Sequence, residues 1–434
     1  MENVGYYLSP RPEDRGYSYA LHKWSFGTQP RAKPVVDSLN YFLYTSFCNN
    51  VILLMQEIIM RNMLVMTLIT VMLCCASLAH AAMEGDAIVA PDYVKHEGNK
   101  VWISGLEKAC WGGESEQQNS VIGALAPALQ LMGEEVDYNY LMGVGGAAFR
   151  LQLSWGPDAP HAECGRNCAI PALAAVGYSV TKIKMKGKEA PTADAITEAR
   201  KAIVASINAG RPVLYGGYEC SLIVGYLDEG KTLFMRAYSA EFSDTKEGDV
   251  EMKDWPWDFG ILSEKTTPPA RRESIIKSLQ SAIEMADTPK YGNYFSGFKA
   301  YEQWQADLRD DKAMDEKIAK NFWGYCLGNG YTYGCLSDAR RAGWKYLRVV
   351  SKEFTGLPAQ HLQNAADIYE QLDKTLWIKR ENLPCPWCLM PWDLKKASAW
   401  TPTMRHAQAD VLGQIAEIEK RGLKEIQLAL DTMK

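Results

Sequence analysis

Apolar residues in the second half of the chain recur at the 3.6-residue spacing of amphipathic helices. This pattern starts after about Pro269 and continues almost to the last residue. Gly, Pro and Cys residues occupy the loops between the periodic segments. We therefore predict a helical domain over residues 266–434, with helices in ESIIKSLQSAIEMA, GFKAYEQWQADLRDDKAMDEKIAKNF, LSDARRAGWKYLRVVSKEF, LQNAADIYEQLDKTL and MRHAQADVLGQIAEIEKRGLKEIQLALDTM.

The preceding part of the chain mixes two periodicities. A helix is predicted over residues 119–132, where the four residues SEQQ before it have the capping-box pattern and Gly133 ends the apolar repeat. A second helix is predicted from Asp194 to Asn208, with isoleucines and an alanine along one side.

Three strands follow the second helix. They are predicted at Val213–Tyr215, Ser221–Tyr226 and Thr232–Tyr238, with an Asp-Glu-Gly turn before the last one. Helices mixed with short strands indicate an α+β domain with a small antiparallel sheet over residues 84–265. The fold class is therefore α+β, with a helical domain after it.

Residues 60–81 have the three regions of a secretory signal. Arg61 precedes an uncharged apolar run, and Ala79-His80-Ala81 gives the small-x-small pattern of a cleavage site. We expect an exported protein, periplasmic or extracellular, that starts at Met60 and whose mature form begins at Ala82. Residues 1–59 are then a mis-called start, or an extension before an uncleaved membrane anchor.

The composition excludes nucleic acid as a partner and favours a peptide or a small molecule. The chain carries 47 basic and 52 acidic residues, and no basic stripe indicates nucleic-acid binding. The 13 Trp and 22 Tyr residues suit a concave site for a peptide or a small molecule. We expect no cofactor and, after cleavage of the signal, no membrane association. The oligomeric state is not indicated.

Eight cysteines follow the signal. An even number in an exported chain favours disulfide bonds. The close spacing suggests a disulfide bond between Cys326 and Cys335 across a loop of sequence LGNGYTYG. Local disulfide bonds Cys164–Cys168 and Cys385–Cys388 are also possible pairings. The set comprises Cys110, Cys164, Cys168, Cys220, Cys326, Cys335, Cys385 and Cys388.

Two stretches together resemble a known fold. The helix before Asn208-Ala-Gly-Arg-Pro-Val-Leu, with the strand that ends in Gly225-Tyr226, resembles the C-terminal half of papain-like cysteine peptidases, the double-glycine leader peptidases most of all. Upstream, the run YNYLMGVGG matches a Tyr-x-x-Leu-Met-Gly-x-x-Gly segment of the N-terminal domain of butirosin biosynthesis protein H. The resemblance covers about residues 101–239 and implies amide-bond hydrolysis or acyl transfer.

The resemblance also implies a triad, which this sequence does not preserve. The nucleophilic Cys at the start of the first helix corresponds to Asn119 or Ser120 here. The His on the central strand corresponds to Glu219, and the orienting Asp or Asn falls near Arg236 or Ala237.

Two substitutes for the missing nucleophile stay open. Cys110-Trp111 is similar to the Cys-Trp of papain's active-site helix, and Glu219 or His161 is a candidate base for it. Alternatively Ser120 is the nucleophile with Glu219 as base. Cys110 is also a candidate disulfide partner of Cys220, which excludes the first substitute.

Two further motifs contain cysteine. His161, Cys164 and Cys168 have a spacing that suits three zinc ligands, but a disulfide-stapled loop is favoured because the fourth ligand is missing. Cys385-Pro-Trp-Cys388 is similar to a redox C-x-x-C, and its helical surroundings favour a structural disulfide.

Three functions are consistent with these observations. The first is a papain-like hydrolase or acyltransferase whose degraded triad leaves catalysis open. The second is a non-catalytic protein that binds a peptide or small ligand in the same cleft. Thiol–disulfide exchange through Cys385 and Cys388 is the third.

Overall fold

The computed structural model describes residues 90–106, 117–156, 158–161, 163–185, 190–216, 219–236, 250–252, 258–382 and 394–433, with only the backbone for 377–382. Residues 88–434 form one compact unit. None of the described helices has the length and apolar character needed to cross a membrane. The predicted signal, residues 60–81, lies outside the described residues.

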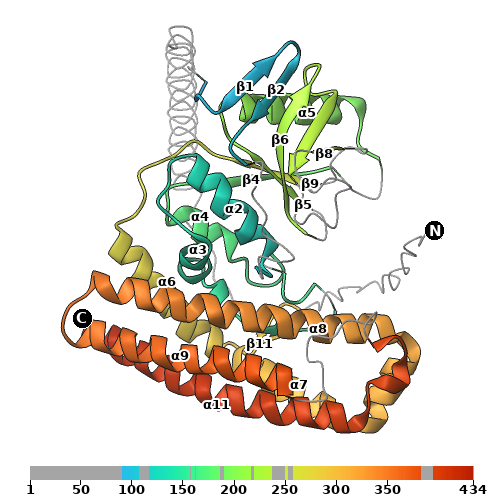
Figure 1. Cartoon of the computed structure of the whole chain (residues 1–434), viewed down its shortest axis with the longest axis vertical. Helices are drawn as coiled ribbons and strands as arrows, with labels where there is room; N and C mark the ends of the chain where they lie inside the picture. The colour runs from blue at the N-terminus through green and yellow to red at the C-terminus, as the bar shows by residue number, and fades with distance from the viewer. Residues whose placement is uncertain are drawn as a thin grey trace, which may run out of the picture. The chain divides into compact units, whose positions relative to one another are not determined.

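The main sheet is antiparallel throughout, and β6 is its central strand (Figure 1). The order is β1-β2-β6-β5-β9-β4, and β7 pairs with both β6 and β8. The strands are β1 Val94–Glu97, β2 Lys100–Ile103, β4 Val180–Lys184, β5 Val213–Gly216, β6 Ser221–Leu227, β7 Thr232–Arg236, β8 Val250–Glu251 and β9 Asp258–Leu262.

Helices cover both faces of this sheet. Residues 221–226 of β6 are all buried, although successive side chains of a strand point to opposite faces. Helices α2 (Ser120–Leu131) and α5 (Ala193–Asn208) both contact β5 and β6. The predicted helices and the three predicted strands are thus present, and the α+β class is confirmed.

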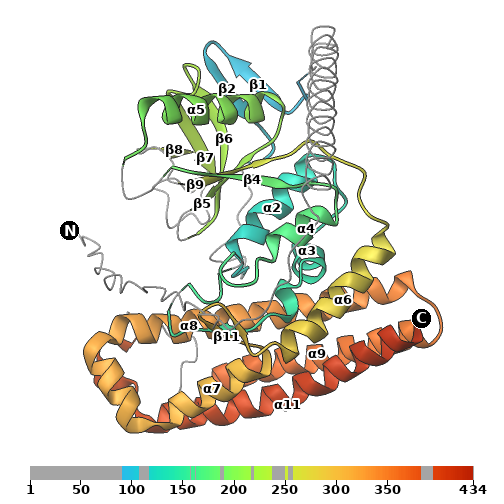
Figure 2. The same ribbon diagram turned by 180° about the vertical axis from the view of Figure 1, so that it is seen from behind.

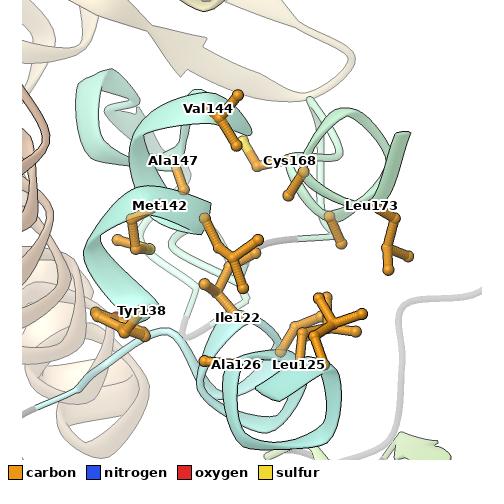
Figure 3. Packing of buried hydrophobic residues seen from close by; sticks show 14 of the residues in the cluster. Ile122, Leu125, Ala126, Tyr138, Met142, Val144, Ala147, Cys168 and Leu173 are labelled. Atoms are coloured by element: carbon orange, nitrogen blue, oxygen red, sulfur yellow. The ribbon is translucent and has the colours of Figure 1, made fainter. Parts of the chain in front are cut away.

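Three short helices lie next to α2. They are α3 (Tyr138–Val144), a 3-10 turn at Ala147–Phe149 and α4 (Ala169–Ala174). Figure 3 shows Ile122 and Leu125 of α2 directed toward Met142 of α3 and Leu173 of α4. This packing fixes the N-terminal end of α2 relative to its neighbours, because all four side chains are buried.

Long helices form the C-terminal part, as predicted (Figure 2). Helix α8 contacts α3 and α9, and α11 contacts α6, α7 and α9. A small sheet was not predicted here: β11 pairs with β10 and with β3. The elements are α6 Arg271–Asp287, β10 Lys290–Tyr291, β11 Tyr294–Ser296, α7 Gly297–Arg309, α8 Asp311–Val350, α9 Leu357–Asn382, α11 Pro402–Thr432 and, upstream, β3 Gln152–Leu153.

The loop predicted between Cys326 and Cys335 is wrong, because both residues lie within α8. Nine residues of helix separate them by roughly 13 Å along the axis, too far for a disulfide bond. Of the glycines that suggested a loop, Gly328 serves close packing instead. A Cβ atom on Gly328 would lie 2.4 Å from the carbonyl oxygen of Trp155.

Candidate functional site

The N-terminal end of α2 is the centre of the candidate site. Asn119 is the N-cap, and its side-chain Oδ1 accepts a hydrogen bond from the Ile122 amide at 3.1 Å. The cap is therefore Asn119 and not the predicted capping box at residues 115–118, of which Ser115 lies outside the described residues. Ser120 follows as the first helical residue and is 3% exposed.

Ser120 and Glu219, which come from different elements, meet at this helix end. Glu219 stands two residues before β6, and its carboxylate lies near the Ser120 side chain. Burial raises the pKa of Glu219, and the nearby Ser120 hydroxyl lowers it in part. The structure thus brings together the two residues that the sequence offered as a nucleophile and its base.

Asp338 of α8 holds the segment that leads into α2. Its Oδ2 accepts hydrogen bonds from the backbone amide of Gln118 at 3.1 Å and from the Tyr138 hydroxyl at 2.5 Å. The Tyr138 hydroxyl in turn accepts a hydrogen bond from the backbone amide of Asn119 at 3.2 Å. Burial raises the pKa of Asp338 to about 6, against the lowering effect of these hydrogen bonds.

A small cavity opens beside Asn119 and Asp338. It leaves about 30 Å³ of space for water-sized groups. Its polar walls are Asn119, Arg150, Gln152, Thr332, Cys335 and Asp338, and its apolar walls are Met142, Ala147, Leu151, Pro160, Leu336 and Ala339. No sequence motif pointed to α8 as part of the site, yet α8 supplies five of these residues.

Arg150 organises the loop that borders the cavity. Its Nη1 donates to the carbonyl oxygens of Cys164 and Arg166, at 3.1 and 2.8 Å. Its Nη2 donates to those of Pro160 and His161, at 2.5 and 2.7 Å. A buried guanidinium therefore holds the loop in place of the disulfide bond that the sequence favoured.

Arg150 is supported in turn by a buried ion pair in the helical part. Arg340 donates to the carbonyl oxygen of Arg150 at 3.1 Å, and its guanidinium lies 2.6 Å from a carboxylate oxygen of Glu419. Tyr301 donates a 2.6 Å hydrogen bond to the same carboxylate. The cavity wall thus rests on groups that are almost fully buried, which makes it rigid.

His161 does not join Ser120 and Glu219. Its Nδ1 accepts a hydrogen bond from the Glu163 amide at 3.3 Å, and none of its hydrogen bonds goes to either site residue. Burial lowers the pKa of His161, so the imidazole is neutral at pH 7. Among the described residues, Glu219 and not His161 is the titratable group beside Ser120.

The described cysteines are neither paired nor activated. Cys164, Cys168 and Cys335 are free thiols. Burial raises the pKa of Cys220 and of Cys335, and the nearby Glu219 carboxylate raises both further. No group of three or more metal-ligating side chains occurs among the described residues, which leaves the zinc interpretation of His161, Cys164 and Cys168 without support.

Several sequence-predicted residues lie outside the described residues. They are Cys110, Ala237, Cys385 and Cys388. Arg236, one of the two residues predicted for the orienting position of the triad, is among the described residues. It is buried in β7, where it pairs with Leu222 of β6. A cation there cannot accept the proton of an imidazole, so this position has no orienting role of the papain type.

The site offers binding groups more readily than a nucleophile. The Glu219 carboxylate lies beside Ser120, and a carboxylate alone is a poor activator of a serine hydroxyl, whose pKa is far higher. By contrast, the cavity presents a carboxylate, a hydroxyl and an amide on firmly held walls. No protein-family model matches the chain, and no curated protein does.

Proposed function

We propose that this chain is an exported, papain-like binding protein that takes up a peptide or small-molecule ligand without cleaving it. The observation that carries the proposal is that Ser120 and Glu219 meet at the N-terminal end of α2. These residues occupy the positions at which the papain-like resemblance expects Cys and His. A hydroxyl and a carboxylate in those places keep the cleft and lose the thiolate–imidazolium pair.

Three features support binding over turnover. The thiols nearest to Glu219, those of Cys220 and Cys335, are held protonated by burial. The neutral imidazole of His161 hydrogen-bonds to the chain beside it. The cavity walls are fixed by Arg150 and Asp338, and a pre-formed site with few polar groups is typical of ligand binding.

Ligand-observed NMR with mixtures of tripeptides tests both halves of the proposal in one sample. Saturation transfer reports binding, and new product resonances after overnight incubation report hydrolysis. We expect transfer without products from the protein that starts at Ala82. Ser120→Ala and Glu219→Gln should weaken transfer, and Ser278→Ala, a buried serine bonded to Tyr346, is the matched control.

Other outcomes separate the alternatives. Products that disappear in Cys110→Ala would establish a cysteine hydrolase, and products that disappear in Ser120→Ala would establish a serine hydrolase. Either result overturns the proposal. Absence of both transfer and products would remove the binding function as well.

Export is part of the proposal and has its own test. Residues 60–81 carry the charge, apolar run and Ala-His-Ala pattern of a cleaved signal. Intact mass spectrometry of the protein expressed from Met60 should give a mass that begins at Ala82, in the exported fraction. A mass that retains residues 60–81 would indicate an uncleaved anchor.

A further inference from the structure

A second, larger pocket lies between the turn that joins α2 to α3 and the helices α6 and α8. It holds about 390 Å³ of space, within the range of about 300–1,000 Å³ that is typical of small-molecule sites. The rings of Tyr140 and Tyr346 line it, with their centroids 6.0 Å apart. Both rings are buried, and the Tyr346 hydroxyl lies 2.6 Å from that of Ser278, so this part of the wall is firmly held.

The charged residues of this pocket are separated by sign. Those on the chain between α2 and α3 are acidic, and they are Glu134, Glu135 and Asp137. Those on α6 and α8 are basic, and they are Arg271 and Lys345. The pocket therefore has an acidic wall and a basic wall, which different elements of the fold supply.

The two walls do not neutralise each other. Among the described residues, no ion pair joins an acidic residue of the pocket to a basic one. Glu134 is paired with Lys265 at 2.7 Å, and Arg271 with Glu353 at 2.9 Å, and both partners lie outside the pocket. The other charges of the two walls are therefore left for a third molecule.

These remaining charges have no counter-ion among the described residues. Asp137 Oδ1 caps α3 at 2.7 Å, and Oδ2 accepts no hydrogen bond there. Glu135 is exposed and makes no ion pair with them. Lys345 is partly buried, and its charge lowers the pKa of Asp338 and of Asp373 from a distance, but it forms no ion pair with either carboxylate.

We propose that this pocket binds a small zwitterion, with its ammonium group at Glu135 and Asp137 and its carboxylate at Lys345. A free dipeptide carries these two groups at its opposite ends, so it can contact both walls at once. A molecule with one charge contacts one wall and leaves the other wall without a counter-ion. Hydrogen bonds between charged groups are the stronger kind, which favours the molecule that makes them at both ends. The inference adds a second site and does not depend on Ser120.

The experiment is a saturation-transfer NMR titration of the mature protein with glycylglycine at pH 7. Two matched probes each lack one charge: N-acetylglycylglycine has no ammonium group, and glycylglycinamide has no carboxylate. We expect both to bind at least about fivefold more weakly than glycylglycine, which is the effect of one exposed ion pair at the upper end of its range.

Two variants locate the two ends of the ligand. Asp137→Asn keeps an oxygen that can cap α3, and Lys345→Met keeps most of the apolar stem, so each removes mainly a charge. Each should lower the affinity for glycylglycine by about threefold to fivefold. Asp137→Asn should leave the affinity for N-acetylglycylglycine unchanged, because that probe has no ammonium group. Lys277→Met is the control: Lys277 of α6 is paired with Glu273 and lies outside the pocket.

Three outcomes would overturn the inference. Equal affinity for the three probes would remove the requirement for both charges. Absence of saturable transfer from glycylglycine would show that the pocket holds only solvent. A loss of affinity in Ser120→Ala, with none in Lys345→Met, would place the dipeptide at the N-terminal end of α2 and not in this pocket.

Discussion

Replacing Asp338 by Asn is expected to stabilise the protein at neutral pH. The amide keeps an oxygen that can accept the hydrogen bonds from Gln118 and Tyr138, and it removes a buried negative charge. The titratable and charged groups around Asp338 are Tyr138 of α3 with Cys335, Arg341 and Lys345 of α8.

The size of the effect follows from the pKa of Asp338, which burial raises from 3.8 to about 6. A shift of one unit corresponds to 1.36 kcal/mol, so ionising Asp338 in the folded protein costs about 3 kcal/mol relative to the unfolded chain. The folded pKa is the higher one. Stability of the natural protein therefore falls as pH rises from about 4 to about 6, and Asp338→Asn removes this decline.

Urea unfolding of both proteins at several pH values is the assay. At pH 8 the free energy of unfolding of Asp338→Asn should exceed that of the natural protein by up to about 3 kcal/mol. The difference should shrink to under about 1 kcal/mol at pH 4. A variant that is less stable at pH 8, or equally changed at all pH values, would refute the account of Asp338 as a buried charge retained at a stability cost.

Three further substitutions test the parts that support the site. Arg340→Met leaves Glu419 buried without its cation, so urea unfolding should show a loss of about 3–5 kcal/mol, and an unchanged midpoint would contradict the buried pair. Arg150→Met removes the donors to four carbonyl groups, so limited proteolysis should cut residues 158–168 faster than in the natural protein, whereas an unchanged rate would exclude this role. Gly143→Ala puts a Cβ 2.0 Å from the Tyr346 ring, and thermal unfolding should show a loss of at least about 1–3 kcal/mol; an unchanged melting temperature would mean that the ring moves freely.

The elements of the fold were largely predictable because they depend on local patterns. The helix at Asp194–Asn208 and the strand at Ser221–Tyr226 follow from periodicity, and the structure places both within a residue of the prediction. The helix α8 was predicted only in part, because its glycines at 328, 330 and 334 read as a loop. The small size of Gly328 serves packing against Trp155, which is far away in the sequence.

Only the site residues that the papain-like resemblance singled out could be predicted from the sequence. Ser120 and Glu219 were named because of their places relative to Gly133 and Gly225, and the structure joins them. Asp338 was missed because its segment has the pattern of an ordinary amphipathic helix, and Thr332 was missed because it lies in the segment that was predicted as a loop. Only the fold shows that α8 reaches the start of α2, more than 200 residues away in sequence.

The central claim is that the chain binds a peptide or small-molecule ligand and leaves it intact. Saturation-transfer NMR on one tripeptide tests it most directly, because a single sample reports both contact and cleavage. The account predicts saturation transfer to the peptide protons and an unchanged spectrum of the peptide after overnight incubation. Absence of transfer, or the appearance of cleavage products, would contradict it.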